Sequence, residues 1–419
     1  MTAPAQGSAD LTARGVTGVG VASLVAAVST NVVLLIAARS LSPAANADFL
    51  VFWSVLFACF GVLGGVQNET TRAVRVARTT APAPGADPRA RVLPIALLTG
   101  AALAGALLVT SPAWGRALLG PGAPTLTVAL ALALIAFSGH SAVAGALGGA
   151  GSWPMYARLV GSEAIVRLVL VGAVALVGAP LVGVEVASAA AAATWIGFFA
   201  LSSRTRSAQR AVADVDASAF VRRTAHAMLA AASSAALVVG FPVLLRLTTP
   251  TSEFELAAPL ILAISMTRAP LLMPLNAYQG VAITHFLSHR QEGIRPLARI
   301  VGAIMGVGAA GALLAVAVGP WLMRALFGTA YHVDGLLLGA LTGAAAMLAV
   351  LTLTGAAVLA LDKHKAYASS WGLATLVTVA VLLLPLDLEA RAVLALALGP
   401  LAGVALHGIV LIRPDRTGR

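Results

Sequence analysis

Apolar runs of about 20 residues recur along this chain, and they limit its possible folds more than any other feature. A helix of this length crosses roughly 30 Å of hydrocarbon. Only helices and closed barrels satisfy every backbone N–H and C=O group in lipid, and the sequence lacks the alternating pattern of barrel strands. With 59% hydrophobic and 10% charged residues, the chain also has too few charges to cover a soluble protein of 419 residues. It is therefore predicted to be an all-α integral membrane protein.

We predict twelve transmembrane helices, at residues 16–38, 49–66, 92–110, 125–148, 158–179, 182–203, 224–246, 256–278, 299–320, 335–360, 368–386 and 392–412. The first is too long for a signal-peptide core, so we expect it to be retained. With the N-terminus inside, 20 Lys and Arg residues fall in inner segments and 5 in outer segments, which predicts that both termini are cytoplasmic. The net charge of +11 is thus a signal of topology and of the anionic inner leaflet, not of nucleic acid. Nearly all basic residues are arginine and alanine is abundant, as in proteins of GC-rich bacteria, so a bacterial plasma (inner) membrane is expected.

An internal repeat divides the chain. The segment SPAWGRALLG at 111–120 recurs as GPWLMRALFG at 319–328, with Arg116 and Arg324 separated by 208 positions. The repeat predicts two parallel six-helix lobes, related by a pseudo-two-fold axis along the membrane normal, around a central cavity; transporters that rock one half against the other have such repeats. The predicted divisions are a cytoplasmic tail (1–15), an N-lobe (16–203), a cytoplasmic linker (204–223) lying along the inner surface as a tether, a C-lobe (224–412) and a second tail (413–419).

Two segments carry a family resemblance. AARSLSPAANADFLVFWSV at 37–55 and AGALGGAGSWPMYARLVGSEAIVR at 144–167 resemble the polysaccharide-exporter, Wzx-like branch of the multidrug/oligosaccharidyl-lipid/polysaccharide (MOP) flippase superfamily. The resemblance implies an alternating-access flippase that exports a polyprenyl-diphosphate-linked saccharide, a cell-envelope precursor, from the inner to the outer leaflet.

Charged residues inside spans are the main candidates for a transport site, because charges in hydrocarbon are costly and tend to face cavities. Arg268 falls near the middle of the eighth span, and Pro270 and Pro274 after it predict a broken helix. We expect Arg268 to bind phosphate; the alternative is an arginine tied to helix carbonyls for packing. Glu163 and Arg167 share a helix face at the i,i+4 spacing. Either Glu163 takes up a coupling proton with Arg167 assisting, or the two form a buried pair that permits insertion.

Other polar residues complete the predicted site. Candidates for substrate binding are Arg72, Arg75, Asn31, Gln67, Asn68, Asn276 and Gln279, and Glu69 and His140 join Glu163 as candidates for ion coupling. Arg75 is equally well explained as a positive-inside anchor, and Asn31 and His140 as members of interhelical hydrogen bonds. Glu185 is assigned to an outer segment, which leaves Glu163 as the one carboxylate inside a span.

Several function classes are excluded or kept as alternatives. The single cysteine, Cys59, and the lack of close histidine spacing predict no metal site and no cofactor. Short outer segments with scattered acids argue against an enzyme. The expected partners are the lipid-linked oligosaccharide, membrane lipids, H+ or Na+ as coupling ion, and glycan polymerases or glycosyltransferases. The alternatives are a MATE-like antiporter of small molecules or ions and a transport-inactive scaffold of an envelope-synthesis complex.

Overall fold

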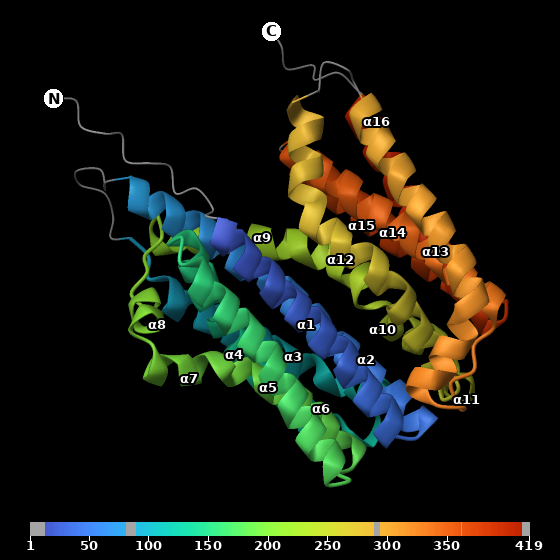
Figure 1. Cartoon of the computed structure of the whole chain (residues 1–419). Helices are drawn as coiled ribbons and strands as arrows, with labels where there is room; N and C mark the ends of the chain where they lie inside the picture. Colours follow the sequence, from blue (N-terminus) through green and yellow to red (C-terminus); the bar gives the residue numbers. More distant parts are fainter. Residues whose placement is uncertain (1–12, 81–88, 289–293, 362, 413–419) are drawn as a thin grey trace. The chain divides into compact units, whose positions relative to one another are not determined.

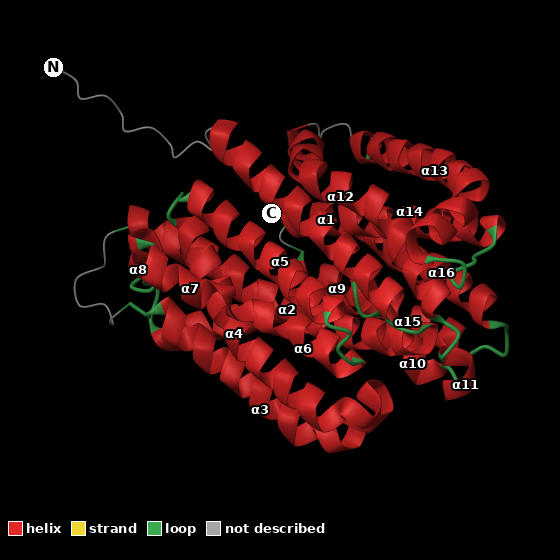
Figure 2. Ribbon diagram, turned by 60° about the horizontal axis from the view of Figure 1, so that its bottom comes forward, coloured by secondary structure: helices red, strands yellow, loops and turns green. Residues whose placement is uncertain are grey.

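The structure is a computed structural model that describes residues 13–80, 89–288, 294–361 and 363–412. Figure 2 shows helices joined by short loops, and the described residues contain no strand beyond one isolated β-bridge. Figure 1 labels the helices in chain order: α1 (Ala13–Ser40), α2 (Pro43–Thr79), α3 (Val92–Leu119), α4 (Ala123–Gly149), α5 (Trp153–Leu176), α6 (Leu181–Ala190), α7 (Thr194–Leu201), α8 (Ser203–Ala208), α9 (Ala217–Val238), α10 (Phe241–Thr248), α11 (Thr251–Phe254), α12 (Ala258–Ser288), α13 (Arg295–Phe327), α14 (Gly335–Ala360), α15 (His364–Leu382) and α16 (Leu388–Ile412).

All twelve predicted spans coincide with helical structure, and the predicted fold class is confirmed. Within the described residues, nine stretches are long and apolar enough to cross a membrane, or ten if the bent pair α9–α10 counts as one span. One of the nine joins α3 to α4 through a 3-10 turn and so contains two predicted spans. The chain is a multi-pass membrane protein.

Breaks fall in helices where the sequence did not predict them. A 3-10 turn divides the predicted span 182–203 into α6 and α7, and a bend of 62° divides 224–246 into α9 and α10. In contrast, α12 is a single helix that contains Pro270 and Pro274, so the predicted break there was wrong. A proline removes only its own N–H from the helix, and neighbouring helices in a membrane bundle can hold such a segment together.

The chain packs as two compact units. Unit 1 comprises residues 1–36, 59–116 and 120–231, and unit 2 comprises 37–58, 117–119 and 232–419. Unit 2 is built around α14, which packs against α12, α13 and α16 (Figure 1). The corner between α1 and α2 belongs to unit 2, where the rings of Phe49 and Phe52 are fully buried. The units therefore do not follow the half-chain division residue by residue.

Each copy of the repeated segment contains the end of a helix whose last residues belong to unit 2, and an arginine from the other half of the sequence caps each end. Arg39 donates hydrogen bonds from Nε and Nη2 to the carbonyls of Leu326 and Ala325 at the end of α13, each over 2.6 Å. Arg246 donates to the carbonyl of Ala117 at the end of α3 over 3.2 Å. Cations at helix C-termini satisfy the last carbonyls and oppose the negative end of the helix dipole. We refer to these contacts as the crossed caps.

The predicted linker is anchored along unit 1. Its first residues form α8, and the extended segment that follows pairs with residues 90–92: Ala90 N–H donates to Val215 over 2.9 Å, and Ala213 N–H donates to Ala90 over 2.8 Å. Ala213 and Phe220 are fully buried. Because its backbone and side chains are held in this way, the segment 209–220 is part of the packed unit and not a free tether.

Candidate functional site

A buried ion pair lies on α5 in unit 1. Glu163 and Arg167 lie one turn apart on α5, pair with each other as their spacing predicts, and are both buried. Arg167 Nε also donates to the carbonyl of Ser188 on α6 over 3.2 Å. The guanidinium carbon lies 5.9 Å from the ring centroid of Phe60 on α2, within the range of a cation–π contact. Arg167 thus links three helices around one carboxylate.

His140 belongs to the same interior. Its ring stacks on that of Phe137 with centroids 5.1 Å apart, and Phe137 stacks on Phe60 at 3.8 Å. The His140 side chain is 3% exposed, and its Nδ1 has no hydrogen-bond partner among the described residues. The structure therefore connects His140 to Arg167 through the stacked rings of Phe137 and Phe60, which sequence spacing alone did not indicate.

The predicted position of Glu185 was wrong. This residue lies in α6, one helical turn before Ser188, and is 2% exposed, so it belongs to a buried helix and not to an outer loop. Because α6 begins at Leu181, directly after Pro180, Glu185 lies in the second turn of the helix and inside the predicted span 182–203. Glu163 is consequently not the one buried carboxylate of the spans. We call His140, Glu163, Arg167 and Glu185 the buried polar cluster.

Arg268 lies in unit 2, where α9 bends into α10. Its Nη1 donates to the carbonyls of Leu237 and Val238 over 3.2 and 3.3 Å, and its guanidinium carbon lies 5.6 Å from the ring centroid of Phe241. These carbonyls end a helix and have no intrahelical partner, so Arg268 acts as a C-terminal cap. The side chain is buried, and the described residues offer it no carboxylate. A guanidinium has five N–H donors, so this contact leaves most of them for another ligand.

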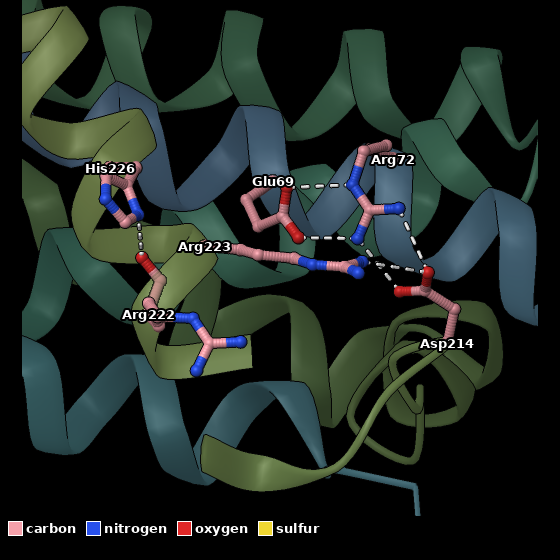
Figure 3. Close-up of polar contacts among 6 residues, drawn as sticks. All are labelled: Glu69, Arg72, Asp214, Arg222, Arg223 and His226. Atoms are coloured by element: carbon pink, nitrogen blue, oxygen red, sulfur yellow. Dashed lines mark hydrogen bonds and ion pairs between the residues drawn. The ribbon is translucent and has the colours of Figure 1, made fainter. Parts of the chain in front are cut away.

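A cluster of four charges ties α2 to the linker segment (Figure 3). Arg72 forms bidentate hydrogen bonds with Glu69, at 2.6 and 2.9 Å, and with Asp214, at 2.9 and 3.0 Å. Arg223 donates to the same Asp214 carboxylate over 3.2 Å. We call Glu69, Arg72, Asp214 and Arg223 the linker clasp. Asp214 and Arg223 were not among the predicted site residues, because nothing in the linker sequence indicates which distant helix it contacts.

The remaining predicted residues are dispersed. Gln67 donates to the hydroxyl of Tyr156 over 3.1 Å, and Asn31 donates to the carbonyl of Ala27 in its own helix over 2.8 Å. Asn68 and Arg75 are exposed. Asn276 and Gln279 lie in α12, but their side chains are outside the described part of the structure. The predicted residues thus form separate groups within the two units.

Asp214 supports a prediction about pH. Partial burial raises the pKa of this carboxyl, but hydrogen bonds from Arg72 and the charge of Arg223 outweigh it, so the pKa lies below its usual value of 3.8. A carboxyl whose pKa is depressed by folding stabilises the fold above its unfolded pKa, and this contribution is lost as the pH falls through the folded pKa. We therefore expect Asp214→Asn to lower the free energy of unfolding by about 1–3 kcal/mol at pH 5–8.

The difference between the variant and the wild type should shrink below about pH 4, where Asp214 takes up a proton. Thermal unfolding in detergent across this pH range measures both effects. Glu255→Gln, an exposed position in unit 2, is the control and should leave the melting temperature unchanged. A constant difference down to pH 3 would contradict the proposed role of the charged carboxylate.

Comparisons with solved structures define the class. An outward-facing MATE family transporter of the MOP superfamily matches with a TM-score of 0.64 at 13% identity, covering 97% of this chain and 96% of that one. An inward-facing MATE structure gives 0.65 at 14% identity, covering 96% and 100%. A MOP superfamily transporter from Pyrococcus furiosus gives 0.63 at 15%, covering 95% of each chain. The protein therefore has the fold of the MATE transporters of the MOP superfamily.

Sequence comparison then gives the family. The chain is 40% identical over 405 residues to "Uncharacterized protein Rv1510" of Mycobacterium tuberculosis (strain ATCC 25618 / H37Rv), covering 96% of this chain and 93% of that protein. It is 39% identical over 401 residues to "Uncharacterized protein Rv3630" of the same strain, covering 95% and 92%. No protein-family model matches. The chain belongs to the family of these mycobacterial proteins.

Proposed function

We propose that this protein is an alternating-access flippase that exports a polyprenyl-diphosphate-linked saccharide, as in the Wzx-like, polysaccharide-exporter branch of the superfamily. The observation that carries the proposal is Arg268, a buried guanidinium without a carboxylate among the described residues. Moving a bare diphosphate into hydrocarbon is very costly. Charge-assisted hydrogen bonds from a guanidinium to phosphate oxygens offset that cost, and Arg suits this geometry better than Lys.

The buried polar cluster is the proposed site of ion coupling. Glu163 exchanges a proton or Na+ while Arg167 holds its position, and His140 lies in the same interior through Phe137, which stacks on both His140 and Phe60. No nucleotide-binding motif is present in the sequence, so an ion gradient or consumption of the product on the outer side supplies the driving force. In this proposal the protein lies in the plasma membrane of a bacterium, and both of its termini are in the cytoplasm.

The crossed caps add a structural condition for transport. Arg39 and Arg246 each bind helix ends from the opposite half of the sequence. If the two halves of the sequence separate at these helix ends during export, the hydrogen bonds of the crossed caps break. The conformation in which these hydrogen bonds are intact is therefore closed at the helix ends. Differential contacts of this kind set the balance between conformations.

A MATE-like antiporter of cations is the second candidate. Its support is Glu185, which together with Glu163 gives helices α5 and α6 two buried carboxylates against one buried arginine, Arg167. Carboxylates in a cavity bind cations, so the two arginines that the sequence places inside spans, Arg167 and Arg268, do not favour an anion by themselves. Against this candidate, Arg268 remains without a carboxylate partner among the described residues. The P. furiosus transporter is described as having a binding pocket of reverse polarity that suggests a different function, so the fold accommodates both signs of charge.

We do not propose a catalytic role. Glu253 and Glu255 lie close together in the sequence, but Glu253 forms an ion pair with Arg391 over 2.8 Å and is not a free reactive acid. A transport-inactive scaffold that binds glycosyltransferases or a glycan polymerase remains the third alternative, and the transport assay separates it from the other two.

The test is transport in reconstituted vesicles with two probes, a fluorescent polyprenyl-diphosphate oligosaccharide and a cationic dye. We expect the wild type to move the lipid-linked probe across the bilayer and to ignore the dye. In detergent, the same lipid-linked probe should raise the melting temperature, because a ligand that binds only the folded state stabilises it. Movement of the dye alone would favour the antiporter, and movement of neither probe would favour the scaffold.

A further inference from the structure

Unit 1 contains a partly open pocket of about 460 Å³ that none of the predicted site residues line. Its walls are the end of α2, with Val74 and Arg78, the end of α4, with Leu147, and the linker segment, with Ala208 and Arg210. The volume lies in the range of small-molecule sites. The pocket is separate from Arg268, which belongs to unit 2.

The charges of the pocket are all of one sign. Arg78 and Arg210 line it, and no acidic residue does. Both side chains are exposed, and neither forms an ion pair or side-chain hydrogen bond with a described residue. The arginines nearby differ: Arg72 binds Glu69 and Asp214, Arg89 donates to the carbonyls of Ala77 and Thr80, and Arg206 donates to that of Phe199.

The acids close to the pocket are already bound elsewhere. Glu69 and Asp214 belong to the linker clasp, and Asp216 accepts hydrogen bonds from Ser218 and Ala219 at the start of α9. Among the described residues, these acids do not pair with Arg78 or Arg210. The two guanidinium groups of the pocket therefore have no counter-ion there.

The end of α4 does not supply negative charge to the pocket either. Its last carbonyls are paired: Ser152 N–H donates to Leu147 over 2.8 Å, and Gly151 N–H donates to Gly148 over 3.0 Å. Gly151 has a φ of 72°, the left-handed conformation of a Schellman cap. A helix C-terminus capped in this way offers few free acceptors to a cation, so Arg78 and Arg210 dominate the local charge.

We propose that this pocket binds a phosphate group through Arg78 and Arg210, with the apolar wall of Val74, Leu147 and Ala208 beside it. Phosphate is the anion that paired arginines bind with charge-assisted hydrogen bonds. The group belongs either to the headgroup of an anionic phospholipid or to a phosphorylated solute, and both present the same oxygens. Because α2 and the linker segment form two of its walls, a bound phosphate also fastens the linker to unit 1.

The experiment uses the full-length protein in detergent and follows its melting temperature by tryptophan fluorescence. The probes are short-chain phosphatidylglycerol, inorganic phosphate, and short-chain phosphatidylcholine as a zwitterionic comparison. We expect phosphatidylglycerol to raise the melting temperature by a few degrees at saturation, and phosphatidylcholine to have no effect. Arg78→Gln and Arg210→Gln should each weaken binding about tenfold, and the double variant should abolish it.

Arg158→Gln is the matched control. Arg158 lies on α5 of unit 1, is also exposed, and does not line the pocket, so this variant should bind like the wild type. Stabilisation by phosphatidylglycerol alone identifies a lipid headgroup, and equal stabilisation by inorganic phosphate identifies a soluble ligand; both support the site. No stabilisation by either probe, or stabilisation that survives in the double variant, overturns it. The unliganded melting temperature of each variant verifies that it is folded.

Discussion

Replacing Arg167 with leucine should destabilise the protein strongly. Removal of one partner leaves the buried carboxylate of Glu163 without a counter-charge, and breaking such a pair costs about 3–5 kcal/mol. The substitution also removes the hydrogen bond to Ser188 and the contact with Phe60. Melting temperature and the monodisperse fraction on size-exclusion chromatography should both fall sharply.

The double variant Glu163→Leu with Arg167→Leu is the matched control. Replacing both members of a buried ion pair by apolar residues is often neutral, so much of the lost stability should return. If Glu163 couples transport to an ion, the stable double variant should also lose the dependence of transport on the ion gradient. A single Arg167→Leu variant as stable as the wild type would show that the pair contributes little.

Replacing Arg268 with alanine should abolish movement of the lipid-linked probe, with a fall in rate of tenfold or more. The change removes the proposed ligand of the diphosphate, and charge-assisted hydrogen bonds contribute more than about 1.4 kcal/mol each, the equivalent of a factor of ten. Stability should fall as well, by about 1–3 kcal/mol, because the carbonyls of Leu237 and Val238 lose their donor.

Two further variants separate transport from folding. Arg268→Lys retains a positive charge but not the forked donor geometry, so we expect partial stability and slow transport. Arg324→Ala removes an exposed arginine of unit 2 that donates to a carbonyl of its own helix, and it should transport at the wild-type rate. An Arg268→Ala protein that is destabilised yet transports normally would reduce Arg268 to a helix cap.

The local spacing of apolar and charged residues was sufficient to predict most of the fold. The twelve apolar runs predicted as spans all fall in helical structure, and the i,i+4 spacing predicted the pair of Glu163 with Arg167. The bend between α9 and α10 was missed because Gly240 and Pro242 lie within a continuous apolar run. Hydropathy measures how apolar a segment is, and a bent helix can be as apolar as a straight one.

Hydrogen-bond and ion-pair partners that are distant in the sequence could not be predicted. The sequence shows that Arg268 lies in an apolar run, but not that it meets carbonyls 30 residues earlier at a helix end. It shows that Arg72 follows Glu69 by one turn, but not that Asp214 completes the group. A site built from several helices depends on which helix faces pack together, and one sequence does not contain that information in its local pattern.

The crossed caps impose an order on biosynthesis. Arg39 and its acceptor Leu326 are 287 positions apart, so the ribosome makes the second roughly 15–60 s after the first at typical elongation rates. During that interval Arg39, at the corner between α1 and α2, has no acceptor at the end of α13. Asn46 in the same corner also lacks its partner, the hydroxyl of Tyr331. Newly inserted helices from the first half of the sequence therefore lack these contacts until translation nears its end.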